Sequence, residues 1–509
     1  MLIERLEVFW SKASLTQKCM LLFCSGASFA LCFAPFHLWP VGFAVIPLFA
    51  WALHHARTRW QCVGLAFAFG YGFSMAGTYW IAFSLLVDAE KFAWLLPFSI
   101  LGLSAVMALW FALLGLSYAW LRTSSATGNL LLLLILYSGM EYVRSVGIFG
   151  FPWNLVGYIP AHSDRLAQIA SLVGIYGLSL LALAVLLTPA LYLLRTAYRL
   201  HFTGVAVALV LCAYGYGMWR MPETSPLTET TLRIVQPNIA QSLKWTPEGK
   251  REAMRVLTSL SRGETTPDYI IWPESALPFT LHPNDDLQQL RGALGVPQRT
   301  LIAGSMRAET RDDTLRVYNS IVAFNRTPQY YDKRQLVPFG EFVPFRNLLP
   351  IEKITGGNLD FSRGKAHAAL LPENSPVPLI CYEVIFPHLA HAQNGETWLL
   401  TLTNDAWFGN SPGPYQHYAM AKLRAVEQGL PLVRSANTGI SAVIDAYGRE
   451  HKVLGIDSRG VIDSHLPAPA AKTLYSRYGN SLFLIMLLGL CVAYLPQIRS
   501  LLCESVNKG

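Results

Sequence analysis

The sequence predicts a membrane protein of about eight transmembrane α-helices, with an α/β domain inserted between the last two. Two observations lead to this fold class. Of the 509 residues, 52% are hydrophobic and only 14% are charged, whereas about 25% are charged in an ordinary soluble domain. The charged residues are also unevenly spread, being scarce at both ends of the chain. We therefore expect a seven-helix membrane domain at residues 1–220, an α/β domain at 229–470 and a closing span at 481–497.

Each predicted span is an apolar stretch close to the ~20 residues that a helix needs to cross a bilayer. The stretches cover residues 18–35, 38–54, 61–86, 92–121, 128–146, 166–195, 202–219 and 481–497. The first could instead be a cleaved signal peptide, but further apolar stretches follow it at once.

The Lys and Arg residues of the short loops predict the orientation of the spans. One side of the predicted membrane holds Arg5, Lys12, Lys18, Arg57, Arg59, Arg122, Arg195, Arg199, Arg499 and Lys508. The opposite short loops hold Lys91, Arg144 and Arg165. Because basic loops stay in the cytoplasm, we expect cytoplasmic termini and an α/β domain on the far side of the membrane. The net charge of +8 reflects this bias, and no basic run interleaved with aromatic residues predicts a nucleic-acid partner.

The predicted α/β domain contains one cysteine, Cys381. Six of the other cysteines fall in apolar stretches, where thiols usually pack as small hydrophobic groups. A single cysteine has no disulfide partner in its domain, and no pair has the spacing of a zinc site. Cys381 is therefore either buried filler or a reactive thiol.

Within this domain, predicted strands alternate with predicted helices. The strands cover residues 232–237, 269–272, 300–305, 317–324, 329–337, 377–384, 398–403, 432–436 and 441–446. The helices cover 248–262 and 415–428, and a shorter one is expected after Pro387. This order indicates a sheet-based domain with helices on its faces.

Three residues in this domain could carry chemistry. Cys381 lies between an apolar strand and the helix expected at Pro387, and a thiol near a helix N-terminus ionises more easily. Glu274 follows an apolar strand and is well placed as a general base, although such a residue is more often a cap or an ion-pair partner. Lys333 ends another strand and could stabilise an oxyanion, although most lysines in loops are simply solvated.

In the order Glu, Lys, Cys, these residues and their flanking motifs resemble the nitrilase superfamily. The motifs are Trp272-Pro273-Glu274-Ser275, Asp332-Lys333, Cys381-Tyr382-Glu383, Asn404-Asp405-Ala406-Trp407-Phe408-Gly409, and Arg424, Glu427 and Asn437. The resemblance covers about residues 229–470. It implies an αββα sandwich with Glu274, Lys333 and Cys381 as its catalytic residues.

With its membrane spans, the whole chain resembles the apolipoprotein N-acyltransferase family. Further matches are Gln241-Ser242-Leu243-Lys244-Trp245 and the segment from Val337 to Pro344. The resemblance implies that Cys381 takes the sn-1 acyl chain of a phospholipid, typically phosphatidylethanolamine, as a thioester. The α-amine of a diacylglyceryl-modified apolipoprotein then accepts it. No metal or other cofactor is implied, and the location would be the bacterial inner membrane with a periplasmic catalytic domain.

The same resemblance assigns supporting residues. Glu341 would orient Lys333, Glu383 would tune that cation, and Tyr382 would either support the site or simply pack. The residues implied in substrate binding are Trp245, Phe342 and Trp407, although Trp245 could be an interfacial anchor. The segment from Phe339 to Asp360 fits neither strand nor helix. It is expected to be either a mobile arm near a bilayer or an acyl chain, or a loop packed on its own core.

Two other functions remain open from the sequence. A membrane-anchored amidase acting on a soluble amide would use the same three residues. A transporter or scaffold with an inactive nitrilase-like domain would not need them, so their presence favours an enzyme.

Overall fold

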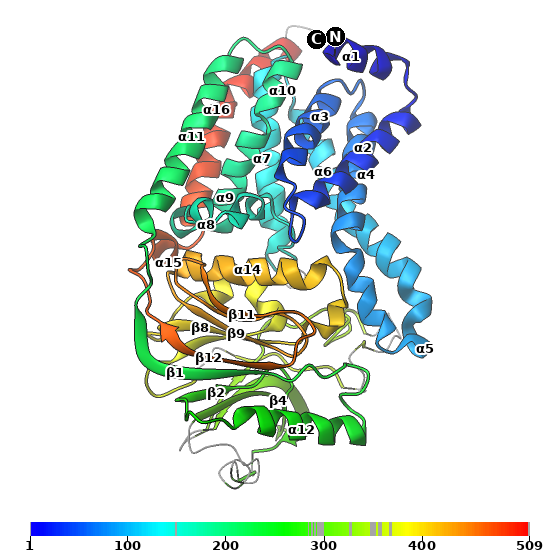
Figure 1. Cartoon of the computed structure of the whole chain (residues 1–509). Helices are drawn as coiled ribbons and strands as arrows, with labels where there is room; N and C mark the ends of the chain where they lie inside the picture. The colour runs from blue at the N-terminus through cyan, green and yellow to red at the C-terminus, as the bar shows by residue number, and fades with distance from the viewer. Residues whose placement is uncertain are drawn as a thin grey trace. The chain divides into compact units, whose positions relative to one another are not determined.

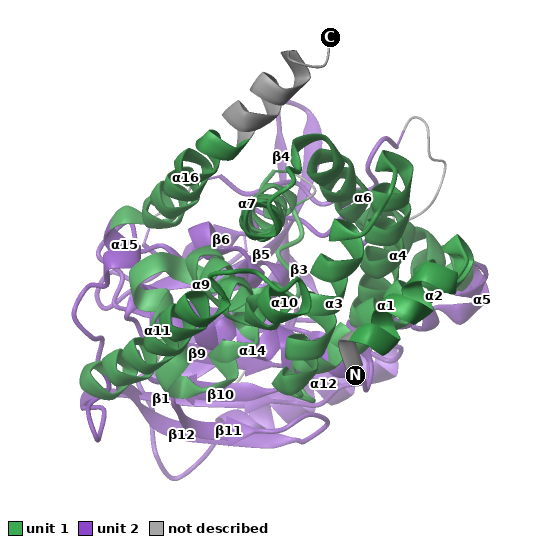
Figure 2. Cartoon of the chain, turned by 90° about the horizontal axis from the view of Figure 1, so that it is seen from above, with its two compact units in different colours: residues 1–82, 95–220, 478–509 green, residues 83–94, 221–477 purple. Residues whose placement is uncertain are grey.

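The computed structural model of the chain describes residues 2–147, 150–283, 285–286, 289, 292, 300–324, 328–346, 353–354, 359–365 and 369–506. The chain forms two compact units (Figure 2). The first comprises residues 1–82, 95–220 and 478–509, and the second comprises 83–94 and 221–477.

The first unit is helical (Figure 1). Its α-helices are α1 Leu2–Lys12, α2 Leu15–Phe29, α3 Gly42–His54, α4 Arg59–Thr78, α6 Leu103–Leu121, α7 Ala126–Ser145, α8 Asp164–Ala167, α9 Ala170–Leu186, α10 Thr188–Leu193, α11 Arg199–Arg220 and α16 Ser481–Val506.

Five helical segments in the described part of the chain are long and apolar enough to cross a membrane. They are Leu15–Cys32, Phe98–Leu121, Ala126–Ser145, Ala170–Leu193 and Arg199–Arg220. Two shorter apolar helices cover Trp39–His54 and Ser481–Gln497. The stretch predicted at 61–86 forms α4 and a 3₁₀ helix at Tyr79–Leu86, which fall outside both groups. The count of eight spans therefore stays a prediction.

Glycines let α2 and α4 approach each other closely. A Cβ on Gly26 would lie 2.0 Å from the carbonyl oxygen of Phe69, and one on Gly72 would lie 2.0 Å from that of Phe23. Only glycine fits either position, and such small-residue contacts are typical of helices that associate in membranes. This close packing ties α4 into the first unit.

Residues 83–94, which include α5 Ala89–Phe92, fold with the second unit although they come between helices of the first. A contact inside the second unit illustrates this: a Cβ on Gly409 would lie 3.2 Å from the ring of Phe83. The sequence predicted spans at 61–86 and 92–121 with only residues 87–91 between them, so the ends of both predicted spans belong to the second unit.

The second unit contains two β-sheets. The first has the strand order β12-β1-β2-β4-β5-β6, with β3 paired to β4, and the second has the order β11-β10-β9-β8-β7. The strands are β1 Leu227–Gln236, β2 Tyr269–Ile271, β3 Thr280–Leu281, β4 Thr300–Arg311, β5 Thr314–Phe324, β6 Gln329–Asp332, β7 Pro376–Ile380, β8 Trp398–Thr403, β9 Leu432–Ala436, β10 Ser441–Ile444, β11 Glu450–Leu454 and β12 Gly460–Pro467.

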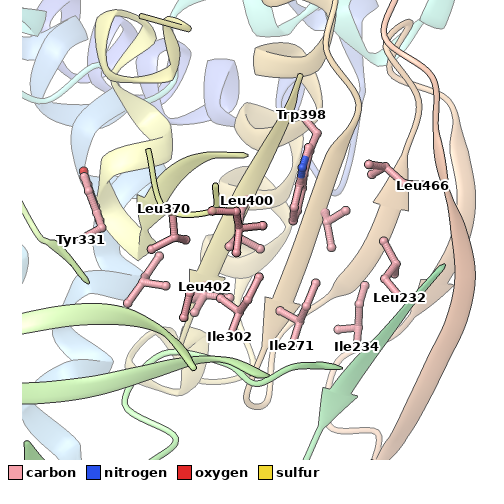
Figure 3. Close-up of a cluster of buried hydrophobic side chains, with 14 of the residues drawn as sticks. Leu232, Ile234, Ile271, Ile302, Tyr331, Leu370, Trp398, Leu400, Leu402 and Leu466 are labelled. Carbon is pink, nitrogen blue, oxygen red and sulfur yellow. The ribbon is translucent and has the colours of Figure 1, made fainter. Parts of the chain in front are cut away.

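The two sheets pack face to face between two helices. Side chains from both sheets, including Ile271, Ile302 and Leu400, form the core between them (Figure 3). Helix α12 Pro247–Ser261 covers the first sheet through a second cluster, and α14 Pro412–Gln428 lies beside the second sheet (Figure 1). Capping residues start both helices, Thr246 for α12 and Ser411 for α14. These layers correspond to the αββα sandwich that the resemblance implied.

Several predicted boundaries are wrong. β6 ends at Asp332 and not at residue 337, and β7 ends at Ile380, one residue before the cysteine. The helix expected after Pro387 is a single 3₁₀ turn, Pro387–Ala390. β3, β11 and β12 were not predicted at all. The first two corrections place Lys333 and Cys381 directly after their strands.

Candidate active site

The residues of the candidate site follow the carboxyl ends of β-strands. Glu274 follows β2, and Lys333 follows β6. Because β2 and β4 are parallel and β5 is antiparallel to both β4 and β6, Glu274 and Lys333 emerge at the same edge of the first sheet. Cys381 follows β7 in the second sheet. Ligands bind at such carboxyl ends in many α/β folds.

Glu274 is held in a buried turn after β2. Trp272, two residues before Glu274, is fully buried and donates its indole N–H to Ser261 Oγ at 2.8 Å. Glu274 Oε1 accepts a hydrogen bond from Asn319 Nδ2 at 2.8 Å, whereas Oε2 has no hydrogen-bond partner among the described residues. Burial raises the pKa of Glu274, against the opposing ammonium of Lys333. A carboxyl group with a raised pKa and an open oxygen suits a general base.

Lys333 is buried between two carboxylates. Its Nζ lies 2.9 Å from Glu341 Oε1 and 3.9 Å from Glu274 Oε1. Its backbone N–H donates to the carbonyl of Asn319 at 2.8 Å, which fixes the start of the loop. Burial alone lowers the pKa of Lys333, but Glu341 and Glu274 outweigh it, so this pKa lies well above the ordinary lysine value. The two carboxylates therefore favour the charged form of this side chain.

Cys381 begins a 3₁₀ helix, Cys381–Ile385, and has a φ of +49°. A left-handed conformation at a non-glycine residue is strained and often marks a functional site. Burial raises the pKa of the Cys381 thiol, Glu274 raises it further, and Lys333 opposes them. The expectation of an easily ionised thiol is therefore wrong, because burial raises the pKa of the thiol more than Lys333 lowers it. The thiol needs a base, and both charged groups of the site act on it.

The two supporting glutamates have different roles in the structure. Glu341 accepts from Lys333 Nζ, as expected for the residue that orients this cation. Glu383 instead accepts hydrogen bonds from Ile380 N–H at 2.8 Å, Arg334 N–H at 2.7 Å and Tyr331 Oη at 2.9 Å. It joins the segment after β6 to the turn after β7, and so holds the Lys333 and Cys381 backbones together.

The aromatic residues implied in binding are only partly buried. Trp245 is 38% exposed. Phe342 is half-buried, and so is Trp407 within the 3₁₀ helix Asp405–Phe408. Tyr382 is half-buried and makes an edge-on contact with Phe386 at 5.1 Å between ring centroids.

The predicted arm is only partly described. Phe339 and Phe345 are 41% and 66% exposed, and both have positive φ. The residues Leu348, Leu349, Ile351, Gly356 and Gly357, on which the mobile-arm expectation also rested, lie outside the described residues.

Sequence reasoning gave no role to two residues beside the base. Asn319 lies on β5 and donates both to Glu274 Oε1 and to Glu341 Oε1, the latter at 3.1 Å. Lys244 is buried and donates to the backbone carbonyl of Glu274 at 3.2 Å, and burial lowers its pKa to about 8. Lys244 and Glu274 line one pocket together with Asn437. An asparagine inside an apolar strand was the one available signal for Asn319.

A chain of amides anchors the loop that carries Lys244. Asn404 follows β8 and donates to Gln241 Oε1 at 2.6 Å. Asn437 follows β9 and donates to Asn404 Oδ1 at 3.0 Å and to the carbonyl of Ile239 at 2.8 Å. The loop after β1 is thereby tied to the carboxyl ends of the second sheet. Within the described ranges, no group of three His, Cys, Asp or Glu side chains could hold a metal ion.

Comparisons with known proteins agree with this architecture. Residues 25–188 match the model of the apolipoprotein N-acyltransferase N-terminal domain, and residues 231–473 match that of carbon-nitrogen hydrolases. The chain is 39% identical over 489 residues to the apolipoprotein N-acyltransferase of Rhodopseudomonas palustris, covering 90% of each chain. It is 37% identical to those of Brucella melitensis and Bradyrhizobium diazoefficiens over 486 residues each, again covering about nine-tenths of both chains.

Proposed function

Because the chain belongs to the apolipoprotein N-acyltransferase family, we propose that Cys381 carries an acyl group as a thioester from a phospholipid to an apolipoprotein. The protein is a bacterial membrane acyltransferase, with a phospholipid donor and a lipoprotein acceptor. One observation carries the proposed mechanism: a buried base with an open oxygen and a cation lie at one edge of the first sheet, and both act on the thiol that follows β7 of the second sheet.

In the first half-reaction, Glu274 takes the proton of the Cys381 thiol. The sulfur attacks the carbonyl carbon of the sn-1 ester, and the ammonium of Lys333 stabilises the tetrahedral oxyanion. The C–O bond of the ester breaks, and the departing glycerol oxygen takes the proton from Glu274. The products are a lysophospholipid and a thioester on Cys381.

In the second half-reaction, a neutral α-amine attacks the thioester. This amine belongs to the diacylglyceryl-modified cysteine at the N-terminus of the acceptor. Glu274 takes a proton from the attacking nitrogen, the C–S bond breaks, and the sulfur recovers the proton. The amide forms without an external energy source, because the thioester stores the acyl group.

Membrane helices suit this reaction because drawing an acyl chain into water costs about 0.8 kcal/mol per CH₂. The proposal places the catalytic unit in the periplasm, both termini in the cytoplasm and eight spans between them. It is supported by the Lys and Arg bias of the short loops. Phosphatidylethanolamine is the proposed donor.

The test uses the purified full chain and a phospholipid with different acyl chains at sn-1 and sn-2. Mass spectrometry of the digested protein should find the sn-1 chain on the peptide of Cys381, and Cys381→Ala should abolish it. Adding a diacylglyceryl lipopeptide should then remove the acyl group from Cys381, and the lipopeptide should gain the mass of that acyl group. Donors with other head groups test the preference for phosphatidylethanolamine.

A distinct result would favour the amidase alternative. In that case no acylated enzyme accumulates with any phospholipid, yet the protein hydrolyses soluble amides in a reaction that needs Cys381. If Cys381→Ala supports normal lipoprotein acylation as the sole copy in cells, the proposed mechanism is wrong.

A further inference from the structure

A buried histidine holds the backbone of the nucleophile from behind. Nε2 of His417, on α14, lies 3.1 Å from the carbonyl oxygen of Cys381. His417 is fully buried, and the ring of Phe408 meets it edge-on at 5.6 Å between centroids. Neither the sequence motifs nor the proposed mechanism gives this histidine a role.

Charged groups hold the histidine in turn. Nδ1 of His417 lies 2.9 Å from Asp405 Oδ1 and 3.1 Å from a guanidinium nitrogen of Arg434. The same guanidinium nitrogen donates to Asp405 Oδ2 at 2.7 Å. Thr403 donates its hydroxyl to Asp405 Oδ1 at 2.9 Å. All four side chains are buried, so the ring is fixed in both position and plane.

These partners determine where the ring carries its hydrogen. The carbonyl of Cys381 can only accept, so Nε2 must carry a hydrogen and donate it. Burial and the charge of Arg434 keep the pKa of His417 below its ordinary value, despite Asp405. Nε2 donates to the Cys381 carbonyl, while Nδ1 faces both the carboxylate of Asp405 and the guanidinium of Arg434. A ring without a hydrogen at Nε2 would set a lone pair against the carbonyl oxygen.

Holding this carbonyl has a consequence on the other side of the peptide group. The Cys381–Tyr382 peptide bond is trans, so its C=O and its N–H point in opposite directions. The unusual φ of Cys381 sets the same peptide group into a turn that a free chain would rarely adopt. A hydrogen bond that pulls the oxygen toward α14 therefore directs the Tyr382 N–H away from α14.

We propose that His417, held by Asp405 and Arg434, is a positioning residue that aims the Tyr382 N–H at the oxyanion of both tetrahedral intermediates. This role rests on the proposed acyl transfer. The backbone N–H would act together with the ammonium of Lys333. The residue after a nucleophile often supplies such a donor in enzymes that place the nucleophile on a sharp turn.

The test compares two variants whose side-chain amides differ by one methylene. In His417→Gln the amide nitrogen reaches about as far as Nε2 and can still donate to the Cys381 carbonyl. In His417→Asn it reaches only as far as Nδ1. We expect His417→Asn to lower the single-turnover rate of Cys381 acylation by about 100-fold and His417→Gln by less than about tenfold. The full chain in detergent is used with phospholipid as donor.

A second reaction of the same thiol separates positioning of the oxyanion from general damage. Alkylation by iodoacetamide consumes the thiol but forms no oxyanion, so its rate should stay within about threefold of the wild-type rate in both variants. If His417→Asn acylates at the wild-type rate, or if alkylation falls as much as acylation, the inference is overturned. If the wild-type chain itself forms no thioester, the proposed function fails instead.

A backbone change covers the case in which His417→Asn does not fold. Replacing Tyr382 by its α-hydroxy acid through nonsense suppression removes the N–H and keeps the side chain. Acylation should again fall by about 100-fold while alkylation continues. An unchanged acylation rate would show that this N–H does not contact the oxyanion.

Discussion

At the scale of single residues, two carboxylates share one ammonium, and their other partners separate their roles. Glu341 accepts from Lys333, from Asn319 and from the backbone N–H of Val337 at 2.9 Å. Glu274 accepts from Asn319 through one oxygen only. Because Glu341 uses both oxygens in hydrogen bonds whereas Glu274 leaves one oxygen open, Glu341 is suited to orient the cation and Glu274 to move the proton.

Removing the charge of Glu341 should separate these roles. We expect Glu341→Gln to lower the rate of Cys381 acylation by about 100-fold, because Lys333 loses its closest anchor in the site. The rate is measured in a single turnover with excess phospholipid. Glu248→Gln is the control, since Glu248 is exposed on α12 and pairs with the exposed Arg251. Equal acylation rates in Glu341→Gln and Glu248→Gln would mean that Glu341 does not contribute to the site.

The pH dependence should report the raised pKa of Glu274. A base works only when deprotonated, so acylation should fall with decreasing pH at values above the ordinary glutamate pKa of about 4.3. The charge of Lys244 opposes the rise in the pKa of Glu274. Lys244→Met should therefore move the acid limb of the pH–rate profile to higher pH.

The control for this shift is Lys422→Met, because Lys422 lies on α14 and pairs with Glu450. Its acid limb should coincide with that of the wild-type protein. An acid limb that is the same in Lys244→Met would mean that Lys244 does not act on the base.

At the scale of elements, strand ends bring the site together. β7, β8 and β9 are parallel, and Cys381, Asn404 and Asn437 each follow one of them directly. The core between the sheets fixes the distance from these residues to Glu274 and Lys333 of the first sheet. Damage to this core should therefore appear first as lost stability.

Leu400 lies on β8 in this core and is fully buried. Leu400→Ala should lower the free energy of unfolding by about 3 kcal/mol, from lost burial and the cavity left behind. Denaturant unfolding of the full chain in detergent, followed by circular dichroism, measures this loss. Val453→Ala is the control, because Val453 on β11 is 44% exposed and should change stability little.

The loop after Lys333 exposes the aromatic side chains of Phe339 and Phe345. Burying one large side chain against an acyl chain contributes about 1.5–3 kcal/mol. Phe345→Ser should therefore raise the KM for phospholipid by about tenfold or more with a nearly unchanged kcat. Leu315→Ser in the β4–β5 hairpin, where Leu315 is 50% exposed, is the matched control. A fall in kcat alone would contradict a binding role.

At the scale of the whole molecule, the orientation in the membrane is open to a direct test. We expect Glu264→Cys, in the loop after α12, to react with a membrane-impermeant maleimide in cells with a permeable outer membrane. Lys12→Cys at the end of α1 should react only after the inner membrane is opened. Both cysteine substitutions are made in a chain in which the other accessible cysteines have been replaced. The reverse pattern would invert the proposed topology.

The success of the sequence predictions differs between elements for physical reasons. β9 was predicted to the residue, because a buried central strand is apolar throughout. β11 was missed because its first four residues are exposed and three of them are polar or charged. β12 was missed because its partner β1 lies more than two hundred residues away, which no local pattern can reveal.

The sequence by itself determined the membrane character, the family, and the positions of Glu274, Lys333 and Cys381, because hydropathy and short motifs are local properties. Only the tertiary structure decided that the thiol is too buried to ionise unaided. It also decided that Glu383 accepts hydrogen bonds from the segments after β6 and β7. The contact of His417 with the backbone of Cys381, and its own contacts with Asp405 and Arg434, likewise came only from the tertiary structure. These properties depend on desolvation and on contacts between residues far apart in the chain, and such contacts exist only once both sheets have packed.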